Sequence, residues 1–71
     1  MLRTSVASSN LASVGYDQLS STLEVQFTSG HIYQYAGVPE SVFAGLMAAF
    51  SKGSYLDAHV KKAGYFCTKI E

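Results

Sequence analysis

The sequence has few of the residues from which disulfides and metal sites are built. It contains one cysteine, Cys67, and no tryptophan among 71 residues, so no disulfide can form within the chain. The two histidines have no cysteines at zinc-binding spacing, and we expect no metal or cofactor. A single cysteine is typical of proteins in a reducing compartment, which predicts a cytoplasmic protein.

Charge and long apolar runs are also scarce. Five basic and five acidic residues give a net charge of zero, whereas proteins that bind nucleic acid without regard to sequence are usually strongly basic. The longest apolar stretch, residues 42–50, has about half of the roughly 18–20 residues that a membrane span needs. Residues 1–10 lack the apolar core of a signal peptide. We therefore expect no membrane partner.

The chain is short, and its composition is that of a folded protein. Hydrophobic residues make up 48% and charged residues 14%, which predicts a single domain over residues 1–71, with residues 1–5 loosely ordered. A domain of this size leaves little room for a catalytic pocket of roughly 300–1,000 Å³. The sequence also lacks a Gly-x-Ser-x-Gly nucleophile motif. These features predict that the protein is not an enzyme.

Alternating apolar and polar residues predict three strands, over residues 10–17, 22–28 and 31–36. The second strand is the clearest, because Leu23, Val25 and Phe27 all point to one side of it. Ser29 and Gly30 mark a hairpin turn between the second and third strands. The three strands are expected to form an antiparallel meander.

The length of that turn decides which way two tyrosines point. A two-residue turn pairs Phe27 with Ile32 and places Tyr33 and Tyr35 on the face opposite the apolar side chains of the second strand. A three-residue turn with Gly30 in a bulge pairs Phe27 with His31 and brings both tyrosines to the core face. A shift of one residue turns every side chain over, and both registers fit the sequence.

Two helices and an extended tail follow the strands. Pro39 and Glu40 suit the first turn of a helix, which we expect to end at Gly53. Ser54 then predicts the start of a shorter helix with Leu56, Val60 and Ala63 facing inward. The predicted fold is α+β: a small three-stranded antiparallel meander with one main helix packed on it, a short second helix, and a C-terminal extended tail over residues 65–70. The tail is β-prone and could fold back as a short edge strand, which the sequence leaves open.

Tyr33 and Tyr35 are the leading candidates for a binding site. Neighbouring aromatic side chains on one strand face can stack on RNA bases. The alternative is that they close the hydrophobic core, with their hydroxyl groups reaching solvent. Lys52, Lys61 and Lys62 follow in the helical region and could supply a local positive charge, or could simply be solvated.

The chain resembles the KTSC domain. The resemblance rests on Leu-x-Val-x-Phe-x-Ser-Gly at residues 23–30, Tyr-x-Tyr at residues 33–35, Val38-Pro39, the segment Phe50-Ser51-Lys52-Gly53, and Tyr55. It covers residues 6–70. The domain is named after the C-terminus of some lysyl-tRNA synthetases and also occurs as a stand-alone protein.

The resemblance implies a small binding module without an established activity. RNA binding has been suggested for the domain because of the synthetase context, and here it would use the two tyrosines and nearby lysines. The alternative is a module that binds another protein or a second copy of itself.

Overall fold

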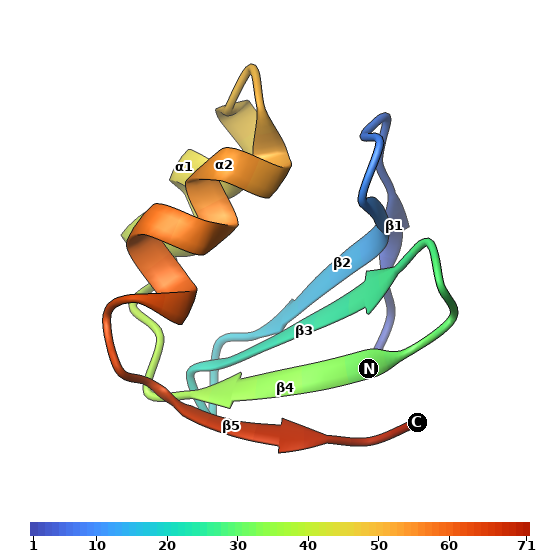
Figure 1. Ribbon diagram of the computed structural model, residues 1–71. Helices are drawn as coiled ribbons and strands as arrows, with labels where there is room; N and C mark the ends of the chain where they lie inside the picture. The colour runs from blue at the N-terminus through green and yellow to red at the C-terminus, as the bar shows by residue number, and fades with distance from the viewer.

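The computed structural model describes all residues, 1–71, and contains one antiparallel sheet with two short helices on one of its faces (Figure 1). The five strands are hydrogen-bonded in chain order: β1 (Thr4–Ser5), β2 (Leu11–Asp17), β3 (Thr22–Phe27), β4 (Ile32–Ala36) and β5 (Phe66–Lys69). Between β4 and β5 lie α1 (Glu40–Ala48), α2 (Lys52–Leu56) and a π-helical turn, η1 (Asp57–Lys61).

The predicted three-stranded meander with one main helix is wrong, because both ends of the chain add a strand. The expected C-terminal tail pairs with β4, whose outer backbone groups would otherwise lack protein partners. Near the N-terminus, Thr4 and Ser5 pair with Val14 and Ser13 of β2. Both helices are short: α1 has nine residues, and α2 has five and continues into the five residues of η1.

The hairpin between β3 and β4 has the three-residue turn. Phe27 donates its backbone N–H to the carbonyl of His31 over 2.9 Å, and Gly30 donates to Phe27 over 2.9 Å. Gly30 has a φ of 97°, which glycine adopts without the steric penalty of a side chain. In the resulting register Tyr33 lies opposite Val25. Both tyrosines of the Tyr-x-Tyr motif therefore share the core face of the sheet.

The helices begin and end at residues other than those expected. Ala49, which is extended, ends α1, and the Ser51 hydroxyl caps α2 by accepting from the Ser54 N–H. Gly53 consequently lies inside α2 instead of terminating the first helix. It is needed there for close packing, since a Cβ at this position would lie 3.0 Å from the Asn10 side-chain amide nitrogen. Ala63, expected to face inward, is exposed.

A single core fills the space between the helices and the sheet. Its buried members come from β2, β3, β4, the segment before α1, α1, α2 and η1: Leu11, Val14, Leu23, Val25, Tyr35, Val38, Leu46, Leu56 and Val60. The two helices also approach each other closely, because a Cβ on Gly45 of α1 would collide with the Tyr55 ring of α2. The core thus ties the helical pair to the middle of the sheet.

The opposite face of the sheet carries an ion pair between the exposed Arg3 and the buried Glu24. The Arg3 guanidinium bonds to the Glu24 carboxylate, which also accepts a hydrogen bond from Gln34 over 2.8 Å. Burial by itself raises the pKa of the Glu24 carboxyl, but the hydrogen bonds from Gln34 and Arg3 and the charge of Arg3 outweigh it, so the pKa is lowered. This pair anchors the N-terminal strand on the sheet.

We predict that Gly30→Ala lowers the free energy of unfolding by about 1–2 kcal/mol, because alanine is strained in the left-handed region. A Cβ there meets nothing within 4 Å, so the cost is purely conformational. Chemical denaturation of both proteins measures it. Ser29→Ala serves as the control in the same turn and should change little. A Gly30→Ala variant as stable as the parent would contradict the turn geometry.

Candidate functional site

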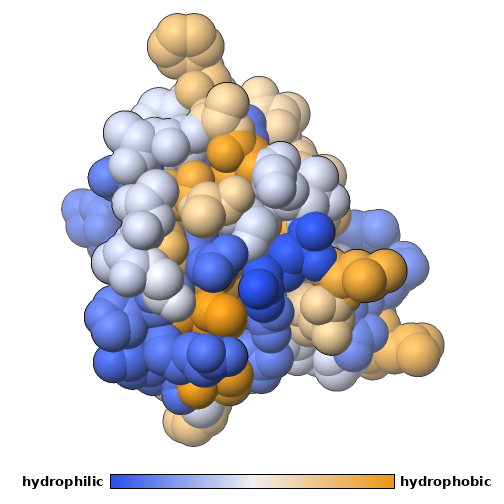
Figure 2. All heavy atoms as spheres, turned by 90° about the vertical axis from the view of Figure 1, so that its right-hand side faces the viewer, coloured by the Kyte–Doolittle hydropathy of each residue, from blue (hydrophilic) through white to orange (hydrophobic).

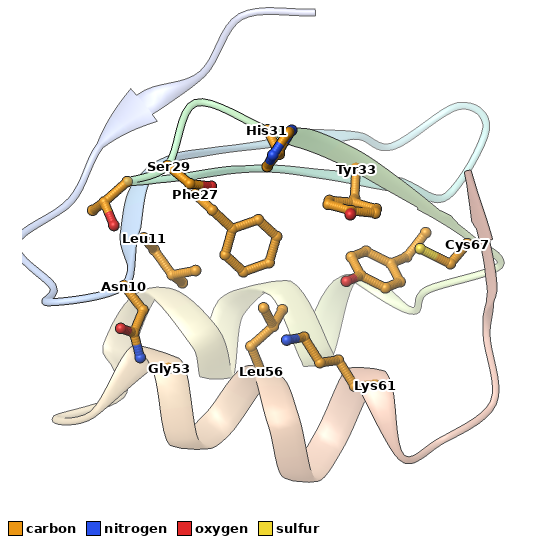
Figure 3. Close-up of a pocket in the computed structure, with 12 residues that line it drawn as sticks. Asn10, Leu11, Phe27, Ser29, His31, Tyr33, Gly53, Leu56, Lys61 and Cys67 are labelled. Atoms are coloured by element: carbon orange, nitrogen blue, oxygen red, sulfur yellow. The ribbon is translucent and has the colours of Figure 1, made fainter. Parts of the chain in front are cut away.

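A pocket of about 550 Å³ lies between the core face of the sheet and the α2–η1 helical segment (Figure 3). Its volume falls within the range of roughly 300–1,000 Å³ that is common for ligand sites, so the expectation that a domain of this size has little room for such a pocket is wrong. The residues that line it come from β2 to β5, from the turns beside these strands, and from α2 and η1: Asn10, Leu11, Phe27, Thr28, Ser29, His31, Tyr33, Tyr35, Gly53, Leu56, Lys61 and Cys67.

The aromatic wall of the pocket is built by the hairpin. Phe27 ends β3 and Tyr33 lies in β4, and their ring centroids are 5.6 Å apart with an interplanar angle of 82°. This edge-to-face arrangement is a favoured contact between aromatic rings. Both rings are partly exposed, whereas Tyr35 is only 4% exposed and belongs to the core. Phe27 and Tyr33 therefore supply the accessible aromatic surface.

Tyr35 presents a hydroxyl group that stays protonated at physiological pH. Burial raises the pKa of Tyr35 from 10.0 to about 12, together with the negative charge of the neighbouring Cys67 thiolate, the hydrogen bond between the two side chains and a smaller effect of Tyr33. The pairing of Tyr35 with Cys67 in the sheet places the two side chains together. Tyr35 is thus a core residue that also borders the pocket.

Lys61 reaches the pocket because the helix widens before it ends. The Lys62 N–H donates to the carbonyl of Asp57, five residues earlier, over 3.1 Å, which is the π-helical pattern. In a regular α-helix Lys61 would lie about 140° around the axis from Leu56. Five-residue spacing places the two on one side, and both line the pocket. The Lys61 ammonium lies 5.1 Å from the centroid of the Phe27 ring, a cation–π contact.

The structure brings together only some of the candidate residues. Tyr33, Tyr35 and Lys61 meet at the pocket. Lys52 lies elsewhere and donates to the Ala49 carbonyl over 3.1 Å. Lys62 pairs with Asp57 at 3.3 Å and does not line the pocket. The positive charge at the tyrosines is thus that of one lysine, not three.

Other pocket residues were not singled out from the sequence. Phe27 looked like an ordinary core residue of its strand, and its role follows only once the three-residue turn is chosen. Cys67 was assigned to an extended tail and His31 to the start of the third strand. Their placement depends on β5, whose pairing with β4 brings residues 67 and 35 side by side. Only the β-prone character of residues 65–70 hinted at this.

The pocket carries a local positive charge within a neutral protein. Lys61 is the one lysine or arginine among the lining residues, and no aspartate or glutamate lines the pocket. No three His, Cys, Asp or Glu side chains are grouped so that they could hold a metal ion. With its apolar lining residues and the charge of Lys61, the pocket suits a ligand with an apolar part and a negative group.

Neither helix is long and apolar enough to cross a membrane.

Comparison with known proteins identifies the family to which this fold belongs. The family model of the KTSC domain matches residues 7–65, which include the hairpin, both helices and the π-helical turn. The chain belongs to the KTSC domain family. The crystal structure of a KTSC domain protein from Yersinia pestis is 41% identical, with a TM-score of 0.92 over 99% of this chain and 97% of that chain. The five-stranded KTSC fold is thus shared with a solved relative.

Relatives include both separate proteins and part of a large enzyme. An uncharacterized protein from Stutzerimonas stutzeri is 38% identical over the full length of both chains. A protein from Tsukamurella paurometabola is 41% identical over 79% of this chain and 84% of its own. A lysine–tRNA ligase from Nostoc punctiforme is 41% identical over 65% of this chain, which corresponds to 8% of the ligase.

We predict that Tyr35 makes the stability of this KTSC domain fall between pH 10.0 and about 12. Unfolded Tyr35 releases its proton near the lower value, whereas folded Tyr35 retains it up to the higher one, so the stabilisation present at lower pH is lost as pH rises. Chemical denaturation across this range, with the parent compared with Tyr35→Phe, measures the effect. The stability difference should narrow with rising pH, and parallel curves would contradict the prediction.

Proposed function

We propose that this KTSC domain is a small, non-enzymatic binding module of the cytoplasm and that its ligand is single-stranded RNA held at the pocket. The observation that carries the proposal is the meeting of accessible aromatic rings, Phe27 and Tyr33, with the Lys61 ammonium. Proteins that bind single strands combine aromatic stacking surfaces with positive charge near the backbone phosphates. The lone Cys67 agrees with a reducing compartment.

The relatives add support from a different direction. The lysine–tRNA ligase from Nostoc punctiforme contains a segment similar to 65% of this chain, and such an enzyme has an RNA substrate. The neutral net charge argues against a long basic surface that follows many phosphates. We therefore expect RNA to bind at the pocket alone. There Lys61 is free to pair with a phosphate, because no aspartate or glutamate lines the pocket.

We predict that Tyr33→Leu weakens binding of a fluorescently labelled single-stranded RNA by about 5- to 150-fold, the loss of roughly 1–3 kcal/mol that removal of one base-stacking ring causes. Fluorescence anisotropy at low salt measures the affinity. Leucine retains an apolar side chain against the core, and circular dichroism checks that the variant is folded.

Two further variants keep this test decisive. Tyr33→Phe retains the ring and should bind nearly as well as the parent. Lys61→Gln alters an exposed residue, so it should weaken binding without unfolding the domain. Wild-type protein that does not bind RNA, or variants that bind as well as wild type, would contradict the proposal. Concentration-dependent sedimentation of the protein alone would instead favour self-association, for which the exposed edge strand β5 is available.

A further inference from the structure

The pocket ends at Asn10 and Gly53, whose close contact separates it from a second, smaller pocket of about 320 Å³. Over β2 the sheet face is covered by α1, whose Phe43 stacks on Tyr16 with centroids 5.0 Å apart and planes at 10°. Beside Leu11, Asn10 comes against Gly53 of α2 so closely that no Cβ would fit without a shift. Figure 3 shows Asn10 and Gly53 at one end of the pocket and Cys67 at the other. Successive bases have no continuous track here.

The accessible aromatic surface fits one planar ring. Phe27 and Tyr33 meet nearly at right angles, so they form a corner and not two parallel platforms. A base that lies flat on one ring meets the edge of the other, which is a favourable aromatic geometry. A second base would need another large accessible ring on this face of β4, but Tyr35 is 4% exposed, and the exposed His31 offers only the smaller imidazole ring. Figure 2 likewise shows apolar groups in small areas between polar ones on the face it presents.

The charge in the pocket matches one phosphate. Lys61 is the one cationic lysine or arginine side chain among the lining residues. Lys52 and Lys62 have partners outside the pocket, at the Ala49 carbonyl and the Asp57 carboxylate. Lys61 is therefore the side chain in the pocket that can neutralise the charge of an anion and donate a hydrogen bond to it.

We propose that the pocket is a site for a single nucleotide, with the base in the corner between Phe27 and Tyr33 and one phosphate at Lys61. This inference rests on the proposed RNA binding and narrows it. The chemistry, a planar ring with one phosphate, is offered both by a free nucleotide and by the end of an RNA strand. A strand would therefore be held by one terminal nucleotide, whatever its length.

Isothermal titration calorimetry of the full chain tests this with adenosine monophosphate, with linear oligoadenylates from the dinucleotide to the octanucleotide, and with a circular octanucleotide. We expect one protein per linear strand at every length, affinities for those strands within about threefold of one another, and no binding of the circle. Equal affinity for the mononucleotide would identify the free nucleotide as the ligand. Strands that bind about tenfold better would identify the strand end.

The salt dependence gives an independent measure. Neutralisation of one phosphate predicts a slope of about −0.7 in log affinity against log salt concentration. Lys61→Gln should bring that slope close to zero, whereas Lys62→Gln, a change in the adjacent lysine outside the pocket, should leave it unchanged. A slope of about −1.4 or steeper would mean two or more phosphate contacts and would overturn the inference.

The outcomes separate this inference from the proposed function. Binding of the circle, or more proteins bound to longer strands, would leave RNA binding intact and refute the single-nucleotide site. Binding of the mononucleotide without any strand would refute RNA binding and retain the site for a nucleotide. Absence of binding to every probe would refute both.

Discussion

The backbone pairing of Phe27 with His31 determines what the rest of the molecule can present. It fixes a three-residue turn with Gly30 in the left-handed region, and this sets the register of the whole hairpin. With one residue fewer in the turn, Tyr33 and Tyr35 would point away from the helices. The observed register turns both toward the α2–η1 segment, where one completes the core and the other borders the pocket.

The two tyrosines of the Tyr-x-Tyr motif have different surroundings. Tyr35 is buried against the core and holds its proton strongly, whereas Tyr33 is partly exposed beside Phe27. Tyr35 is thus a core residue, and contact with a ligand remains a proposal for Tyr33 alone. The π-helical turn adds the third part of the site by bringing Lys61 onto the side of the helix that faces Phe27. π-Helical turns are uncommon and are often found at functional sites.

Local patterns predicted the middle of this fold well. The alternation of Leu23, Val25 and Phe27 identified β3, and both possible registers of the hairpin followed from turn chemistry. The first helix was also placed correctly at its start, by Pro39 and Glu40. These features depend on residues near one another in the chain, where periodicity and turn preferences are informative.

Features that depend on distant partners were harder to predict. The strand β5 has four exposed residues and gains its place from hydrogen bonds to β4, which composition cannot show. Gly53 has the appearance of a helix terminator, yet it lies within α2, because α1 already ends at Ala49 and Ser51 caps α2. A regular helical projection places Lys61 away from Leu56, and only the π-helical turn reverses this. Some residues of the pocket could therefore be singled out from the sequence, but their arrangement around one pocket could not be predicted.

Nuclear magnetic resonance mapping of ligand-induced shifts tests the central claim, that the space between the hairpin and the α2–η1 segment is the binding site. On titration with adenosine monophosphate or a short single-stranded RNA, the account predicts that the largest shifts occur at Phe27, Tyr33 and Lys61, while Arg3 and Glu24 on the opposite face stay unchanged. The largest shifts on that opposite face, or shifts that follow protein concentration instead of ligand concentration, would contradict it.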